Sequence, residues 1–323
     1  MNPLSAMFGA GVSIRNRLYD RATFRSYRLQ APVVSIGSLS SGGAGKTPFL
    51  IMLGELLKDR GVAFNVLSRG YGRRTKGIAL VDPSCSPQEF GDEPLLIARK
   101  LGVPVIVGEG RHAAGKFAEE KFGLQVHLLD DGFQHRRLAR DFDIVLLTER
   151  ELQDSLLPAG RLREPLSSLA RASAIVLMDG AGSDQIPLRK GQHVWRVSRG
   201  IVLPETTDAC VAFCGIARPQ NFFAELAQAG IKLAGTRVFR DHHAYRATDV
   251  ESLYKLAQEL GAAAFITTEK DAVNLGDYVK RLQPLQVVAV RMEFEQSSET
   301  GTASPVDQLC AAIQRRNETP VRE

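Results

Sequence analysis

A glycine-rich loop stands between an apolar run and a predicted helix in the stretch Val33-Val34-Ser35-Ile36-Gly37-Ser38-Leu39-Ser40-Ser41-Gly42-Gly43-Ala44-Gly45-Lys46-Thr47-Pro48. Closely packed phosphates need backbone N–H donors from residues without bulky side chains, a lysine ammonium for the outer phosphates and a hydroxyl for Mg²⁺. Gly42, Gly43 and Gly45 supply the first, Lys46 the second and Thr47 the third. The stretch therefore predicts a nucleoside triphosphate site.

The loop departs from the usual Gly-x-x-x-x-Gly-Lys-Thr pattern, because Ser40 stands where the first glycine belongs. Its context supports the interpretation: a β-branched strand precedes it, and residues 47–53 begin a helix with Pro48 near its first position. An ordinary strand-to-helix turn is the alternative. The residues expected to hold the phosphates are Ser40, Ser41, Gly42, Gly43, Ala44, Gly45, Lys46 and Thr47.

Apolar runs alternate with helical patterns after this loop. Strands are expected at 62–67, 103–107, 126–129, 143–147 and 174–178, with helices near 93–100 and 111–121. This alternation is typical of an α/β fold with a mostly parallel sheet and helices on both faces, here of the P-loop NTPase type. A second series of strands and helices follows and predicts a smaller α/β domain.

The length of 323 residues favours two domains over one. We expect an N-terminal helix in residues 1–30, a P-loop domain in 31–180, a polar, glycine-rich linker in 181–200 and the second α/β domain in 201–323. The four cysteines are scattered and lack the spacing of a zinc site. Free cysteines without such a pattern are typical of a reduced, cytoplasmic compartment.

The net charge of +5 is concentrated at the N-terminus, where residues 1–30 hold five arginines and one aspartate. The apolar residues 4–14 precede these arginines and fall short of the ~20 needed to span a bilayer. Aromatic residues interleaved with arginine suit an in-plane helix on an anionic membrane. A helix packed on the protein body is the alternative, and no basic-aromatic pattern indicates nucleic acid.

Two acidic residues, Asp130 and Asp131, follow the apolar strand 126–129. Mg²⁺ bound to nucleotide phosphates takes carboxylate oxygens at the C-terminal edge of a sheet, near the loop hydroxyl of Thr47. We therefore predict a metal site made by Thr47, Asp130 and Asp131, with plain turn residues as the alternative. His127 inside the strand is interpreted as a core histidine.

Other polar segments are ambiguous by themselves. Asp92 lies at a predicted helix start, where a cap explains it as well as a catalytic base does. Arg69, Tyr71 and Arg73 follow a strand and suit an anionic substrate or phosphates, with a solvated basic loop as the alternative. The segments that hold Arg163-Glu164 and His242-His243 carry no decisive pattern alone.

Taken together, the segments resemble the tetraacyldisaccharide 4'-kinases, which phosphorylate the lipid A precursor. The resemblance runs through most of the chain and rests on eight segments in order: Gly42–Pro48, Ser68–Arg73, Gly91–Pro94, Asp130–Arg136, Leu162–Leu166, Gly215–Pro219, Asp241–His243 and Thr267–Ala272.

This resemblance implies ATP and Mg²⁺, a tetraacyldisaccharide 1-phosphate as acceptor of the γ-phosphate at its 4'-hydroxyl, and peripheral attachment to the cytoplasmic face of the inner membrane. It implies catalysis in a cleft between the two domains. No obligate protein partner is evident from the sequence. Asp92 becomes the expected base, paired with His242 or His243. Glu164 joins the acidic, metal-proximal set, and Arg163 the substrate-binding residues.

A membrane-associated switch ATPase of the partition or insertion type is the competing hypothesis, since such proteins also carry Gly-Gly-x-Gly-Lys-Thr loops. It would not need the second half of the chain with Arg163-Glu164-Pro165 and Asp241-His242-His243. A GTPase fits less well, because Lys270 and Asp271 are adjacent and so do not match the guanine-reading Lys-x-Asp.

Overall fold

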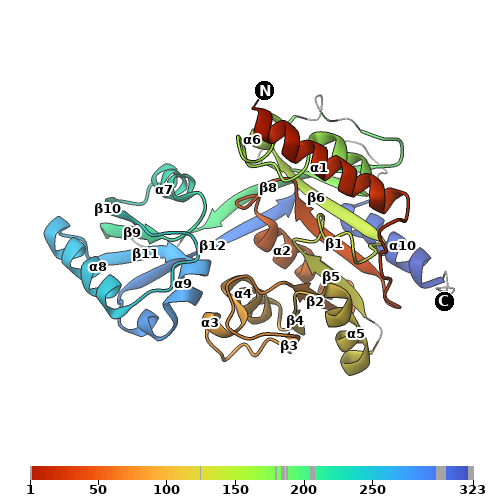
Figure 1. The fold of residues 1–323 in the computed structure, drawn as a ribbon. Helices are drawn as coiled ribbons and strands as arrows, with labels where there is room; N and C mark the ends of the chain where they lie inside the picture. The colour runs from red at the N-terminus through yellow and green to blue at the C-terminus, as the bar shows by residue number, and fades with distance from the viewer. Residues whose placement is uncertain are drawn as a thin grey trace.

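A computed structural model describes residues 2–123, 125–178, 180–182, 186, 188–203, 208–295 and 303–318. Its strands form a sheet with the order β10-β9-β11-β12-β8-β7-β6-β1-β5-β2-β4-β3. Helices lie on both faces of this sheet (Figure 1). The predicted fold class, a mixed α/β protein with a mostly parallel sheet, is confirmed.

The first lobe is built around β1, which pairs in parallel with β5 and β6. Its strands are β1 (Val33–Ser38), β2 (Phe64–Ser68), β3 (Ala79–Leu80), β4 (Val105–Val107), β5 (Val126–Asp130), β6 (Phe142–Thr148) and β7 (Ala174–Met178). Strands β1, β2, β4, β5 and β7 are buried along their whole length. Parallel strands covered on both faces need such continuous apolar runs.

Helices of the first lobe and the N-terminal segment are α1 (Pro3–Asp20), α2 (Lys46–Asp59), α3 (Pro87–Phe90), α4 (Asp92–Leu101), α5 (Arg111–Phe122), α6 (Glu149–Leu152) and the 3₁₀ helix η1 (Leu166–Arg171). Alternate residues of β6 enter opposite cores: Ile144 packs in the core with α2 and α4, and Val145 in the core with η1. No helix among the described residues is long and apolar enough to cross a membrane.

The second lobe contains three more parallel strands beside β12. Its elements are β9 (Cys210–Cys214), α7 (Pro219–Gln228), β10 (Leu233–Val238), α8 (Ala247–Leu260), β11 (Ala264–Thr268), α9 (Glu269–Leu275) and the 3₁₀ helix η2 (Gly276–Lys280). β9 lies between β10 and β11, and α7 and α8 pack in separate cores on opposite faces.

Two long strands, β8 (His193–Val202) and β12 (Leu285–Phe294), join the lobes in one sheet. The two strands pair with each other in antiparallel. β8 also pairs in parallel with β7 of the first lobe, and β12 pairs in parallel with β11 of the second lobe. Residues 193–200 of the expected linker therefore form most of a strand. Buried and exposed residues alternate along β8, with Trp195 and Val197 buried. The exposed polar residues between them explain why the sequence predicted a linker here.

The last described helix, α10 (Pro305–Glu318), packs on the first lobe, although residues 201–323 are predicted to form the second domain. Its buried residues Val306, Leu309 and Ile313 enter the core that holds α2. The chain thus crosses to the second lobe on β8 and returns on β12 (Figure 1).

Candidate active site

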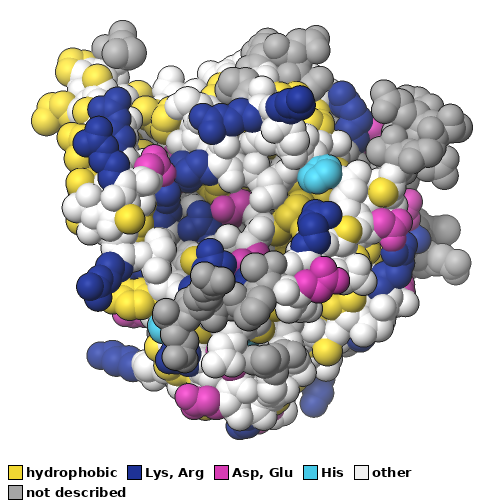
Figure 2. All heavy atoms as spheres, turned by 90° about the vertical axis from the view of Figure 1, so that its right-hand side faces the viewer, with side chains coloured by type: hydrophobic (Ala, Val, Ile, Leu, Met, Phe, Trp, Pro, Cys, Tyr) yellow, Lys and Arg dark blue, Asp and Glu magenta, His cyan; other side chains and the backbone are white. Residues whose placement is uncertain are grey.

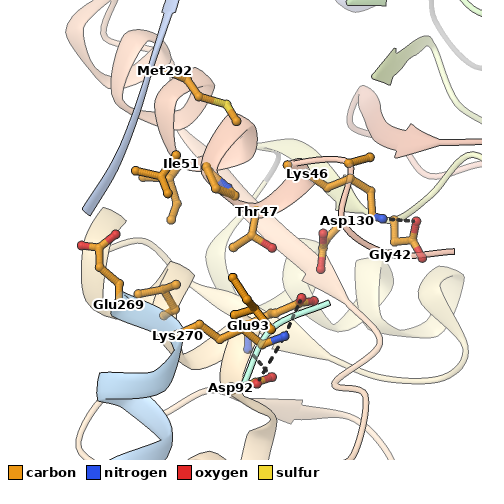
Figure 3. A pocket seen from close by; sticks show the side chains of 18 of the residues that line it. Gly42, Lys46, Thr47, Ile51, Asp92, Glu93, Asp130, Glu269, Lys270 and Met292 are labelled. Atoms are coloured by element: carbon orange, nitrogen blue, oxygen red, sulfur yellow. Dashed lines mark hydrogen bonds and ion pairs between the residues drawn. The ribbon is translucent and has the colours of Figure 1, made fainter. Parts of the chain in front are cut away.

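A cleft of about 1470 Å³ lies between the two lobes. The first lobe contributes the loop 41–47, the start of α4 and the end of β5. The second lobe contributes Asp241, His242 and Lys270, and the joining strands contribute residues such as Arg199 and Met292. Figure 3 shows Lys46, Thr47 and Asp130 in one part of this cleft and Asp92, Glu93 and Lys270 in another.

The predicted phosphate loop connects β1 to α2 through a tight turn. Gly42, Gly43 and Gly45 have φ of 82°, 73° and 75°, the left-handed region that side chains disfavour. Gly45 is the N-cap of α2, so Lys46 and Thr47 form the first helical turn. Backbone N–H groups at the start of a helix, such as this 14-residue one, together with its positive dipole end, favour an anion.

Lys46 and Arg163 both bind Asp131. Lys46 Nζ lies 3.5 Å from Asp131 Oδ1, and Arg163 makes two hydrogen bonds of 2.8 and 2.9 Å to the same carboxylate. Although burial opposes it, the hydrogen bond from Arg163 and the charge of Lys46 hold the pKa of Asp131 far below its usual range. Arg163 therefore lies in the cleft with its guanidinium engaged by an aspartate.

Asp130 ends β5 with its side chain pointing into the cleft near Thr47 (Figure 3). It is buried and accepts a hydrogen bond of 2.8 Å from Ser68 Oγ. Burial, with the negative charges of Glu93 and Asp131 nearby, raises its pKa to about 7. The charge of Lys46 offsets only part of this effect. Carboxylate oxygens are the ligands that Mg²⁺ prefers in proteins.

Asp92 and His242 meet across the lobes. Asp92 begins α4 and is 5% exposed, and His242 Nδ1 lies 2.8 Å from its Oδ2. Asn274 donates a further hydrogen bond of 3.0 Å to the same oxygen. Burial opposes ionisation, but the hydrogen bond from His242 and the charge of Lys270 lower the pKa of Asp92 to about 2.

The two neighbouring histidines have different surroundings. His242 has φ of 57° and faces the cleft beside the ring of Tyr71, 5.5 Å away between centroids. His243 Nε2 lies 3.0 Å from Asp249 Oδ2, and its ring stacks on Phe239. The structure thus places His242, and not His243, against Asp92.

Four of the predicted site residues do not line the cleft: Ser40, Arg73, Glu164 and His243. Glu164, expected near the metal, is fully buried elsewhere, where it pairs with Arg171 and accepts hydrogen bonds from Asn16 and Arg15. Arg73 donates to the carbonyl of Gly77 and to Thr75 within its own loop. Glu164 is drawn away by partners on α1 that lie far from it in the sequence, whereas Arg73 is held by residues of its own loop.

Sequence reasoning also missed several cleft residues. Arg111 begins α5, is 7% exposed and has a buried Nε with no hydrogen-bond partner among the residues that the structure describes. His135 lies beside it, and burial together with the charge of Arg111 lowers its pKa to about 4. Lys270, in the quoted segment 267–272, is the third. The segments Thr267–Ala272 and Asp130–Arg136 offered a signal for Lys270 and His135 without assigning either a role, whereas Arg111 lies in none of the quoted segments.

Comparison with known proteins identifies the chain. A family model described as LpxK, tetraacyldisaccharide-1-P 4'-kinase, matches residues 1–310. The chain belongs to this family. A tetraacyldisaccharide 4'-kinase from Koribacter versatilis is 47% identical over 326 residues, covering 98% of this chain and 99% of that protein.

Other members agree with this assignment. A tetraacyldisaccharide 4'-kinase from Aquifex aeolicus is 36% identical, covering 85% of this chain and 89% of that protein. A crystal structure of LpxK from Aquifex aeolicus in complex with ATP has a TM-score of 0.76 and 32% identity, covering 97% of each chain. As a member of the family, the protein is an ATP-dependent 4'-kinase of lipid A biosynthesis, and the switch ATPase is not favoured.

Proposed function

We propose that this kinase transfers the γ-phosphate of ATP to the 4'-hydroxyl of a tetraacylated glucosamine disaccharide 1-phosphate, with Asp92 as base and His242 as its partner. The observation that carries the proposal is the contact of 2.8 Å between Asp92 and His242, which joins the two lobes within the cleft that the phosphate loop also lines. Its lowered pKa keeps Asp92 ionised at neutral pH, so the carboxylate is free to accept a proton in the cleft.

The proposed step is a direct phosphoryl transfer. The 4'-hydroxyl oxygen forms a bond to the γ-phosphorus, the bond from that phosphorus to the β–γ bridging oxygen breaks, and ADP leaves. The hydroxyl proton goes to Asp92, with the imidazole of His242 stabilising the carboxyl. Lys46 and the loop amides stabilise the charge of the transferring group.

Magnesium fits the residues at the end of β5. The buried carboxylate of Asp130, whose pKa is raised to about 7, gains a counter-charge when a cation binds. No cluster of three acidic, histidine or cysteine ligands occurs in the part of the chain that the structure describes. Mg²⁺ usually takes one or two carboxylates and completes its shell with phosphates and water. We infer that Asp130, Thr47 and Asp131 hold the ion, which neutralises phosphate charge.

Cationic side chains line the side of the cleft where we expect the anionic part of the acceptor to bind. Arg69, Arg111 and Tyr71 line the cleft on the first lobe, and Arg111 is buried there. Guanidinium groups bind phosphate in a planar, two-point manner. We infer that Arg69 and Arg111 contact the phosphorylated sugar, while Arg163 acts through Asp131.

We also infer that the protein works at the cytoplasmic face of the inner membrane, held by α1. Leu4, Met7 and Ile14 are exposed on one side of α1, and Ser5 and Val12 are buried on another. Hydrophobic side chains gather beside Lys and Arg side chains at the upper left of the molecule in Figure 2. An acceptor whose acyl chains stay in the bilayer must be met at its surface.

Asp92→Asn tests the proposed base. The substitution keeps the side-chain size and removes the charge, so we expect kcat to fall at least about 100-fold. The affinity for ATP, measured by titration of the protein with a fluorescent ATP analogue, stays close to that of the wild type because Asp92 lies apart from the phosphate loop. Retained kcat in the Asn variant would remove Asp92 from the base role.

A further inference from the structure

Lys270 lies at the meeting point of the two lobes, within the segment 267–272 for which the mechanism has no use so far. It is the second residue of α9, and its side chain is 17% exposed. Its Nζ lies 3.0 Å from Asp241 Oδ1 and 3.2 Å from His242 Nε2. The same atom lies 3.8 Å from Asp92 Oδ2 and 3.7 Å from Glu93 Oε1. The ammonium of Lys270 thus lies against both members of the proposed Asp92–His242 pair.

The hydrogen-bond chemistry of this contact fixes the tautomer of His242. An ammonium has three donors and no acceptor, so Nε2 must accept from Lys270. The proton of the neutral imidazole then sits on Nδ1, which faces the carboxylate of Asp92 at 2.8 Å. A doubly protonated ring would instead turn an Nε2–H toward the ammonium, placing two donors and two like charges 3.2 Å apart.

The charges around the pair act in opposite directions. Asp92 raises the pKa of His242, and Asp241, 3.9 Å from Nε2, adds to this effect. Lys270 lowers the pKa of both His242 and Asp92. Glu93 faces Lys270, and the neutral ring of Tyr71 lies on the cleft side of His242. Lys270 is therefore a cation that limits how readily the pair takes up a proton from solvent.

We propose that Lys270 is a positioning residue that keeps the Asp92–His242 pair in its proton-accepting form and in the Nδ1–H tautomer. The inference rests on the proposed role of Asp92 as base. It does not require Lys270 to touch either substrate, because the ammonium acts through His242 and Asp92.

Lys270→Met removes the charge and keeps much of the side-chain length. Both pKa values of the pair then rise, so the acidic limb of kcat against pH should move to higher pH by about one unit, as expected for one lost charge at this range. At the acidic end this is roughly a tenfold loss of rate. The rate should recover toward that of the wild type as the pH is raised, and Lys270→Arg should return the limb toward its original position.

Lys100→Met is the matched control. Lys100 forms an ion pair with Glu269, which also joins α4 to the start of α9, but it contacts neither Asp92 nor His242. Loss of an inter-lobe ion pair alone should leave the position of the acidic limb unchanged. A pH-independent loss in Lys270→Met, or an equal shift in the control, would overturn the proposal.

A second measurement uses the unaltered protein and so does not depend on the folding of a variant. ¹⁵N spectra of histidine-labelled protein at pH 8, with the signal of His242 assigned through His242→Asn, should show a neutral ring protonated on Nδ1. A ring protonated on Nε2 would contradict the inference. If Asp92→Asn keeps full activity, the proposed function fails; if it is inactive but Lys270→Met shows no shift, only this inference fails.

Discussion

At the residue scale, the site depends on one contact between groups 150 positions apart, Asp92 and His242. Each of the two residues is followed in the sequence by another acidic residue or another histidine that makes different contacts. Glu93 pairs with Lys270, and His243 pairs with Asp249. The residue type alone therefore does not show which carboxylate and which histidine form the proposed pair. Their contacts in the folded chain show it.

This distinction predicts opposite phenotypes for the two histidines. His242→Asn should lower kcat at least about 100-fold, because it removes the partner of the base. His243→Asn should leave kcat within about threefold of the wild type and lower the free energy of unfolding by about 1 kcal/mol, because it loses a partly exposed hydrogen bond and ring stacking. Steady-state kinetics and urea unfolding of both variants check this. A catalytic defect confined to His243→Asn would reverse the assignment.

The residue scale also shows where sequence reasoning stops. The strand, turn and helix around Lys46 are local, so spacing and glycines predicted them. Asp92 was ambiguous because a helix-start aspartate is explained by capping, and the histidine that distinguishes it lies in the other lobe. The family resemblance predicted that Glu164 lies near the metal. The sequence around Glu164 does not indicate that Asn16 and Arg171 are its partners.

At the element scale, Glu164 holds α1 on the first lobe. Its carboxylate is fully buried and binds Arg171 of η1 and Asn16 of α1. Removal of one partner from a buried ion pair leaves an uncompensated charge, which typically costs about 3–5 kcal/mol. We expect Glu164→Ala to lower the melting temperature and to expose α1 to limited proteolysis, with Glu164→Gln intermediate. Lost catalysis with an unchanged melting curve would return Glu164 to the reaction.

The exposed face of α1 carries its own prediction. Charges at Leu4 and Met7, which are 61% and 72% exposed, should weaken membrane binding without unfolding the protein. We expect Leu4→Asp with Met7→Asp to lower co-sedimentation with anionic phospholipid vesicles several-fold. Ser13→Asp is the control, because Ser13 is exposed on another side of the helix. Equal binding of all three proteins, or a lost melting transition, would favour α1 as a packed structural helix.

At the scale of the whole molecule, the two lobes share one sheet through β8 and β12, and α10 returns the chain to the first core. Sequence patterns predicted the two series of strands but not this connection. The buried residues of β8 alternate with polar ones, and its antiparallel partner β12 lies about ninety residues further along. Pairing at such separation is a tertiary event that local patterns do not encode.

This continuity predicts cooperative unfolding. Trp195, the single tryptophan of the chain, lies on β8, stacks on Phe142 and donates to Gln308 of α10. Its fluorescence reports the junction, whereas far-ultraviolet circular dichroism reports both lobes. We expect the two signals to give coincident thermal transitions. Two separated transitions would mean that the lobes unfold independently despite the shared sheet.

The central claim is that the protein transfers the γ-phosphate of ATP to a hydroxyl of a glycolipid bound in the cleft. Its most direct measurement is the transfer of labelled γ-phosphate from ATP to purified tetraacyldisaccharide 1-phosphate in detergent micelles, with Asp92→Ala run beside the wild type. We predict a labelled lipid from the wild type and none from the variant. Hydrolysis of ATP without a labelled lipid would contradict the account.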